Sequence, residues 1–209
     1  GEDGVTVVQA KLFGDIIRKL PSGDITVEEE EGDMIRIMGS KSEFKIVGLS
    51  ADEFPSFGED EEGQEKIVFD KELMKDMIRK TAFSASIDES KGVITGILTE
   101  LTKNSLNMVA LDGFRMAVMR EKAEHQSERK IVIAAKIMNE IGKIISETEE
   151  DGVLEFFVGK KKAIAKLNDT KIVMRLIDGE FIKYKDILPK EHKCTVKVSK
   201  AELLFLYCR

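Results

Sequence analysis

The sequence contains few of the side chains on which redox and metal chemistry depend. It has no tryptophan, two histidines and two cysteines in 209 residues. Cys194 and Cys208 are too few for a disulfide scaffold. The segment EHKC offers a metal only His192 and Cys194, whereas structural zinc takes four ligands. His125 lies in the polar segment EKAEHQSERK, where we expect it to be solvated. The sequence therefore predicts no metal site and no cofactor.

The common catalytic motifs are also missing. There is no G-x-x-x-x-G-K-[ST] phosphate loop, no G-x-G-x-x-G after a strand, no G-x-S-x-G elbow and no H-E-x-x-H pair. Asp112 in LDGFR could serve as an acid, but an Asp-Gly pair is typical of a turn. No apolar run reaches the roughly 20 residues that cross a bilayer. We expect a soluble, cytoplasmic protein that is not an enzyme and does not contact a membrane.

The strongest internal signal in the sequence is repetition. A short apolar strand followed by a helix with a lysine in its first turn occurs four times, at intervals of 60 to 65 residues. The four lysines are Lys11, Lys71, Lys136 and Lys200. The last copy, VKVSKAELLFLY, ends without a helix-capping signal, so we expect the chain to be a piece of a longer protein.

Each of the first three copies predicts one helix and about three antiparallel strands. The helices are expected over 10–20, 70–80 and 134–145, each with an apolar stripe that faces a core. Turn residues such as Gly32-Asp33, Asn104-Ser105 and Asn168-Asp169 separate the strands. The expected stripes are Leu12, Ile16, Ile17 and Leu20; Leu73, Met74, Met77 and Ile78; and Ile137, Met138, Ile141, Ile144 and Ile145. The fold class is α+β, with the helices on one face of the sheets.

Charge is distributed unevenly along the chain. The formal net charge is −6, yet each of the three helices carries a net positive charge. Lys71, Lys75 and Arg79 are four residues apart and share one helical face. Such faces could contact nucleic-acid phosphates without reading sequence, or the lysines could simply solvate the helices. The acidic stretch 51–65, which contains proline and glycine, reads as an interdomain linker.

Three segments carry a family resemblance. They are LDGFRMA (111–117) within 92–120, RLIDGEFIKYKDILPK (175–190) and SADEFPSF (50–57). In that order they resemble the bacterial DNA polymerase III beta subunit family, the sliding clamps. The resemblance implies three similar domains per subunit, each built from two copies of the repeat, and two subunits closed into a ring around double-stranded DNA. By this comparison, 1–63 is the second half of domain 1 plus a linker, 64–190 is domain 2, and 191–209 begins domain 3.

The resemblance also implies three sets of site residues. Cationic side chains would face the DNA: Lys11, Arg18, Lys71, Lys75, Arg79, Lys91, Lys136 and Lys143. A pocket would bind short apolar peptides of the DNA polymerase III catalytic subunit and the clamp loader: Ile94, Leu111, Gly113, Phe114, Arg115, Met116, Ile182, Asp186 and Ile187. Phe44 and Ile46 would lie at the interface of the homodimer that the full-length protein forms. Leu111, Phe114, Ile182 and Asp186 depart from the usual family residues.

Two other interpretations of the sequence remain open. The chain could be an unrelated repeat scaffold for protein–protein interaction, with lysines that only solvate its helices. It could also be an enzyme such as a nuclease, which would need a carboxylate cluster that binds magnesium.

Overall fold

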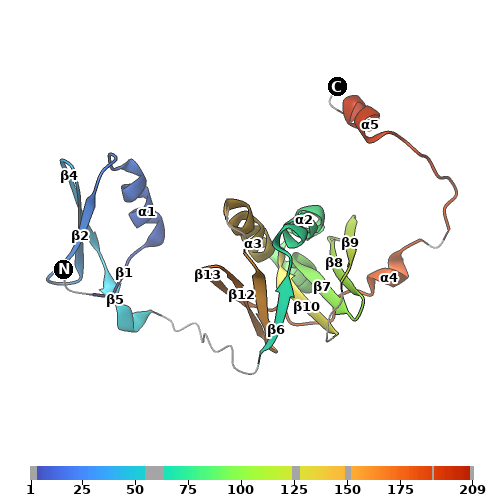
Figure 1. Cartoon of the computed structure of the whole chain (residues 1–209), viewed down its shortest axis with the longest axis horizontal. Helices are drawn as coiled ribbons and strands as arrows, with labels where there is room; N and C mark the ends of the chain where they lie inside the picture. Colours follow the sequence, from blue (N-terminus) through green and yellow to red (C-terminus); the bar gives the residue numbers. More distant parts are fainter. Residues whose placement is uncertain (1–3, 55–63, 124–127, 149–151, 190, 208–209) are drawn as a thin grey trace. The chain divides into compact units, whose positions relative to one another are not determined.

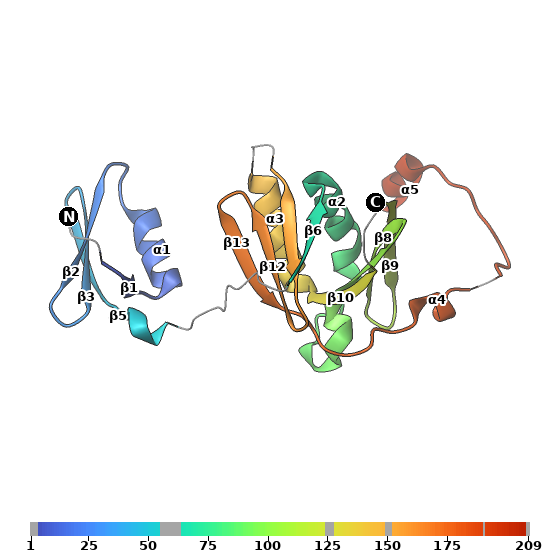
Figure 2. The same cartoon turned by 60° about the horizontal axis from the view of Figure 1, so that its bottom comes forward.

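A computed structural model describes residues 4–54, 64–123, 128–148, 152–189 and 191–207. The chain divides into two compact units, Gly1–Asp60 and Glu61–Arg209 (Figures 1 and 2). Most of the expected linker, residues 55–63, and the expected solvated His125 lie outside the described residues. No helix in the described part of the chain is both long and apolar enough to cross a membrane.

The first unit packs one helix on a small antiparallel sheet. Its elements are β1 (Thr6–Val7), α1 (Ala10–Lys19), β2 (Ile25–Glu30), β3 (Met34–Gly39), β4 (Ser42–Val47), β5 (Leu49–Ser50) and the 3-10 helix η1 (Ala51–Glu53). β2, β3 and β4 form the sheet in that order, and β1 pairs with β5. Ile16 of α1 is buried with Ile35, Ile37 and Ile46 of the sheet.

The predicted stripe of α1 was partly wrong. Leu12 is 44% exposed, whereas Phe13 packs against the core with Ile17 and Leu20. Phe13, Ile16, Ile17 and Leu20 recur at the three- and four-residue spacing of one helical face, which is the face that meets the sheet.

The described part of the second unit contains two long helices and two four-stranded antiparallel sheets. The helices are α2 (Lys71–Thr81) and α3 (Ala135–Glu147). One sheet has the order β10-β7-β8-β9 and the other β13-β12-β11-β6. Their strands are β6 (Glu65–Phe69), β7 (Gly96–Thr102), β8 (Ser105–Leu111), β9 (Met116–Lys122), β10 (Arg129–Ala134), β11 (Leu154–Val158), β12 (Lys162–Leu167) and β13 (Thr170–Arg175). Shorter helices are η2 (Ala82–Ser84), η3 (Glu89–Thr95), α4 (Tyr184–Ile187) and α5 (Lys200–Tyr207).

The two halves of the second unit exchange their first strands. β6 precedes α2 in the chain but pairs with β11, which follows α3. β10 precedes α3 but pairs with β7, which follows α2. Each sheet therefore combines three consecutive strands of one half with one strand of the other half (Figure 1).

The core of the second unit lies between its helices and its sheets. Figures 1 and 2 show α2 and α3 side by side over the sheets. Met77 of α2 and Met138 of α3 are almost fully buried there. The Oδ1 atom of Asp70 accepts the amide hydrogen of Leu73 at 2.7 Å and so caps the start of α2. The predicted apolar stripes of α2 and α3 and the placement of the helices on one face of the sheets are confirmed.

The fourth copy of the repeat was predicted only in part. The helix forms as α5, but 195–199 is not a strand, since no neighbouring strand of the described chain pairs with it.

Candidate functional site

A groove of about 680 Å³ lies between α2 and α3. It is lined by Lys75 and Arg79 of α2 and by Lys136 and Lys143 of α3. These are four of the eight side chains predicted to face DNA, and they come from helices more than 50 residues apart in the sequence. The fold thus gathers cations on the helix side of the second unit. We call this the helix-side groove.

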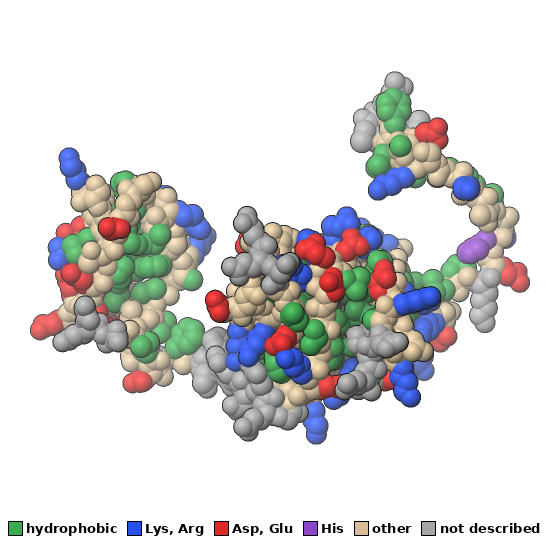
Figure 3. Space-filling view, in the orientation of Figure 1, with side chains coloured by type: hydrophobic (Ala, Val, Ile, Leu, Met, Phe, Trp, Pro, Cys, Tyr) green, Lys and Arg blue, Asp and Glu red, His purple; other side chains and the backbone are tan. Residues whose placement is uncertain are grey.

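Three of the cations in the helix-side groove are paired with a carboxylate three residues earlier. Lys75 pairs with Glu72, Arg79 with Asp76, and Lys143 with Glu140. Figure 3 shows acidic and basic side chains interspersed over this part of the unit. Exposed pairs of this kind contribute little to stability and are screened by salt, so the cations remain available to other anions. The groove is therefore only weakly cationic.

The carboxylate pairing also moves two pKa values. Hydrogen bonds from Lys80 and Arg79 lower the pKa of Asp76. The hydrogen bond to Glu140 raises the pKa of Lys143. Both groups therefore stay charged throughout the neutral range.

The other four predicted cations lie elsewhere. Lys11 and Arg18 are exposed on α1 of the first unit, where Arg18 pairs with Asp15. Lys71 is in the first turn of α2 and does not line the helix-side groove. Lys91 is in η3, with its Nζ 5.9 Å from the centre of the Phe114 ring.

A second apolar cluster covers the opposite face of the β10-β7-β8-β9 sheet. Alternate side chains of the sheet, among them Leu98, Val109 and Val132, point away from the helices. Phe181 and Tyr184 cover them from the segment that follows β13. Of the residues predicted for the peptide pocket, Ile94, Leu111 and Met116 belong to this outer-face cluster.

The turn between β8 and β9 is shaped by Asp112. Its Oδ1 atom accepts the amide hydrogens of Phe114 at 2.9 Å and Arg115 at 3.1 Å, and its Oδ2 atom accepts the Nε hydrogen of Arg115 at 3.0 Å. The two backbone hydrogen bonds are the main reason why the pKa of Asp112 is lowered. Gly113 adopts a φ of +97°, which favours glycine. These hydrogen bonds confirm the prediction that Asp112 builds a turn. At the tip of the turn, Phe114 is 94% exposed.

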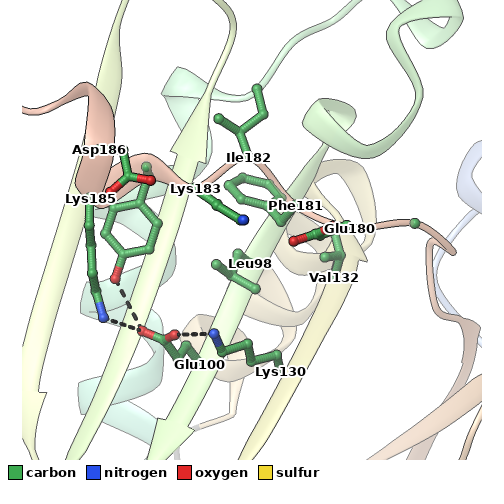
Figure 4. Close-up of a pocket in the computed structure, with 12 residues that line it drawn as sticks. Leu98, Glu100, Lys130, Val132, Glu180, Phe181, Ile182, Lys183, Lys185 and Asp186 are labelled. Atoms are coloured by element: carbon green, nitrogen blue, oxygen red, sulfur yellow. Dashed lines mark hydrogen bonds and ion pairs between the residues drawn. The ribbon is translucent and has the colours of Figure 1, made fainter.

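A cavity of about 500 Å³ lies over β7 and β10 on the same outer face. Leu98, Val132, Phe181 and Ile182 form its apolar wall, and the buried carboxylate of Glu100 lies at its side (Figure 4). Ile182 and Asp186 line this cavity, and Ile187 is 58% exposed at the end of α4. Leu111 and Met116, on β8 and β9, are not among the residues that line this cavity.

The residues predicted for a subunit interface lie on an edge strand. β4 forms one edge of the sheet in the first unit. Phe44 is 38% exposed on this strand, whereas Ile46 is buried in the core of the unit.

The sequence alone did not reveal Glu100 or Phe83. Glu100 is buried and bonded to Tyr184, a partner 84 residues away that no local pattern indicates. The ring of Phe83 lies 5.9 Å from the guanidinium carbon of Arg115.

Among the described residues, no group of three or more His, Cys, Asp or Glu side chains could hold a metal ion, and Cys194 is a free, exposed thiol.

Two family profiles match this chain. The one described as DNA polymerase III beta subunit, N-terminal domain, matches residues 1–58. The one described as DNA polymerase III beta subunit, central domain, matches residues 68–183. Together they cover most of both units.

Individual relatives agree with these profiles. The beta sliding clamp of Halalkalibacterium halodurans is 32% identical over 203 residues, which are 94% of this chain and 52% of the relative. A crystal structure of the DNA polymerase III beta subunit of Thermotoga maritima is 30% identical, with a TM-score of 0.79 over 91% of this chain and 51% of the other. The DNA polymerase sliding clamp of Bacillus subtilis is 26% identical, with a TM-score of 0.79 over 89% and 49%. The chain spans about half the length of the curated relatives it matches.

Proposed function

This chain belongs to the DNA polymerase III beta subunit family, and we propose that it is part of a sliding clamp. In this proposal it is not an enzyme. It helps to encircle duplex DNA and tethers the replicative polymerase and the clamp loader by binding short apolar peptides in their chains. The beta subunit name of its relatives and the two differently built faces of the second unit support this function.

The observation that carries the proposal is the contrast between the two faces of the second unit. The helix-side groove presents Lys75, Arg79, Lys136 and Lys143, which suit loose contact with phosphates. The opposite face presents the partly buried Ile94 and Met116 of the outer-face cluster beside the exposed Phe114 turn, which suits a short apolar peptide. A tether needs both a weak DNA contact and a separate docking site.

The same proposal covers the domain boundaries and the assembly. Residues 1–63 are the second half of a first clamp domain with its linker, 64–190 are a complete second domain, and 191–209 begin a third. Phe44 and Ile46 lie on the strand through which the full-length subunit forms a cytoplasmic homodimeric ring. Lys11, Arg18, Lys71 and Lys91 are the remaining candidates for contact with DNA, and the peptide pocket includes Gly113, Arg115 and Asp186.

DNA binding by the chain tests the proposal. We expect weak binding of a DNA duplex in fluorescence anisotropy at low salt, with log K falling linearly with log salt. Lys136→Gln with Lys143→Gln should reduce the slope by about 0.9 for each phosphate that these lysines neutralise. The matched control, Lys160→Gln with Lys161→Gln, removes the same charge from an exposed hairpin of the other sheet. An equal reduction in both variants would favour the alternative of a protein scaffold whose lysines only solvate its helices.

A further inference from the structure

A row of polar side chains crosses the outer face of the β10-β7-β8-β9 sheet. Lys130, Glu100, Asn107 and Arg120 are direct neighbours on the four strands. The Nζ atom of Lys130 lies 3.0 Å from Glu100 Oε1, and Asn107 Nδ2 donates to Glu100 Oε2 at 3.2 Å. Arg120 Nε donates to Asn107 Oδ1 at 3.1 Å. Glu100 and Asn107 are each only 3% exposed, so this row is an unusual polar feature in an apolar surface.

Tyr184 joins this row from a distant part of the chain. Its hydroxyl group donates to Glu100 Oε2 at 3.1 Å, and the Nζ atom of Lys185 lies 3.7 Å from the same oxygen (Figure 4). The Tyr184 side chain is itself buried in the outer-face cluster. Burial alone would raise the pKa of Glu100, but the hydrogen bonds from Lys130 and Tyr184 and the charge of Lys185 outweigh it and lower the pKa. The carboxylate therefore stays ionised, surrounded by donors.

The segment that Tyr184 anchors has little other regular attachment. The backbone bonds from Tyr184 to Ile182 (2.7 Å) and from Asp186 to Lys183 (2.9 Å) stay within the segment. Before it, the amide of Ile177 donates to the carbonyl of Val132 on β10 at 2.8 Å. Side-chain contacts therefore hold the segment 181–187 on the sheet. Among them, the hydrogen bond from Tyr184 to Glu100 fixes a direction, which apolar packing alone does not.

We propose that Glu100 is a positioning residue: through Tyr184 and Lys185 it fixes the segment 181–187 as one wall of the peptide groove. This inference rests on the proposed function, because it assigns that wall to the docking site beside Leu111 and Met116. Through these contacts, Glu100 determines the positions of Ile182 and Ile187 relative to the sheet.

The chemistry of the site explains why a carboxylate is needed. Glu100 accepts hydrogen bonds from Tyr184, Asn107 and Lys130 and needs no donor of its own. Glutamine has the same shape but only one acceptor oxygen, so it cannot accept from Lys130 on one side and from Tyr184 and Asn107 on the other. Glu100→Gln should therefore weaken the anchor and leave the apolar packing intact.

Hydrogen exchange and peptide binding test the inference together. In Glu100→Gln and in Tyr184→Phe, amides of 178–188 should exchange about threefold to tenfold faster, as expected when one hydrogen bond is removed, while amides of β7 and β8 keep their rates. The double variant should exceed Glu100→Gln only slightly, because both changes break one contact. Glu155→Gln is the matched control, since Glu155 pairs with Lys66 on the other sheet.

The affinity for a short apolar peptide, such as the C-terminal peptide of a DNA polymerase III catalytic subunit, should fall by a similar factor in Glu100→Gln. The inference would be overturned if the amides of 178–188 exchanged at unchanged rates in both Glu100→Gln and Tyr184→Phe. It would also be overturned if these amides exchanged faster while the affinity for the peptide stayed the same. Met116→Glu, with Val68→Glu on β6 as control, separates this from the proposed function. If Met116→Glu leaves peptide affinity unchanged, the docking site itself is wrong, and the groove wall is overturned with it.

Discussion

The two faces of the second unit use charge in opposite ways. On the helix side, Lys75, Arg79 and Lys143 each pair with a carboxylate three residues earlier in the same helix. On the outer face, Glu100 is buried and takes its partners from two neighbouring strands and from a segment 84 residues away. The first kind of pair is local and exposed, and the second is distant and enclosed.

This difference separates charges that can be exchanged from charges that cannot. A phosphate can replace an exposed carboxylate at little cost, because water and salt already weaken the pair. Removing a buried carboxylate leaves its donors without a partner in a place that water reaches poorly. The helix side is thus suited to transient contacts, and the outer face to holding a fixed shape.

The largest effect should come from deleting each kind of carboxylate in turn. Glu100→Ala should lower the free energy of unfolding of the second unit by about 2 to 4 kcal/mol, because buried donors lose their acceptor. Glu140→Ala should change it by no more than about 0.5 kcal/mol. Urea unfolding followed by circular dichroism measures both. Equal changes would mean that the two faces do not differ in the way described.

The second largest effect should be a difference between the two faces in how acid lowers the stability of the second unit. The pKa of Glu100 is lowered in the folded chain, so its stabilisation is present above the unfolded value of about 4.3 and is lost as the pH falls through the folded value. The pKa of Asp76 is also lowered, but in an exposed pair. In roughly 1 M salt, the fall in stability below about pH 4.3 should persist in Asp76→Asn and flatten in Glu100→Gln. Urea midpoints across this range measure it, and a fall that salt abolishes would contradict the assignment to Glu100.

The smallest effect should be a gain of affinity on the helix side. Asp76→Asn releases Arg79 and Lys80 from their carboxylate, so binding of duplex DNA at low salt should strengthen by about twofold to fivefold. Asp169→Asn removes the same charge from the exposed turn between β12 and β13 and serves as the control. Anisotropy titrations measure the gain. If both variants gain equally, net charge alone is responsible and the pairing has no role.

Local features of this molecule were predictable from the sequence, and distant ones were not. The stripes of α2 and α3 and the Asp112 turn follow from spacings within a few residues, which periodicity and turn chemistry reveal. Phe13 rather than Leu12 lies in the core of the first unit, because residues 13, 16, 17 and 20 share one helical face. From the sequence alone, Glu100 would be predicted to be an exposed polar residue of a strand. Its burial depends on Tyr184, which only the folded chain brings near.

The exchange of strands between the halves of the second unit has a consequence for how the chain reaches this shape. β6 finds its place only against β11, so about 85 residues of chain must be present before the strand beginning at Glu65 has a neighbour. A cut between β9 and β10 would leave each piece with an orphaned strand and an incomplete sheet. Although the repeat is visible in the sequence, neither copy can complete its sheet without the other.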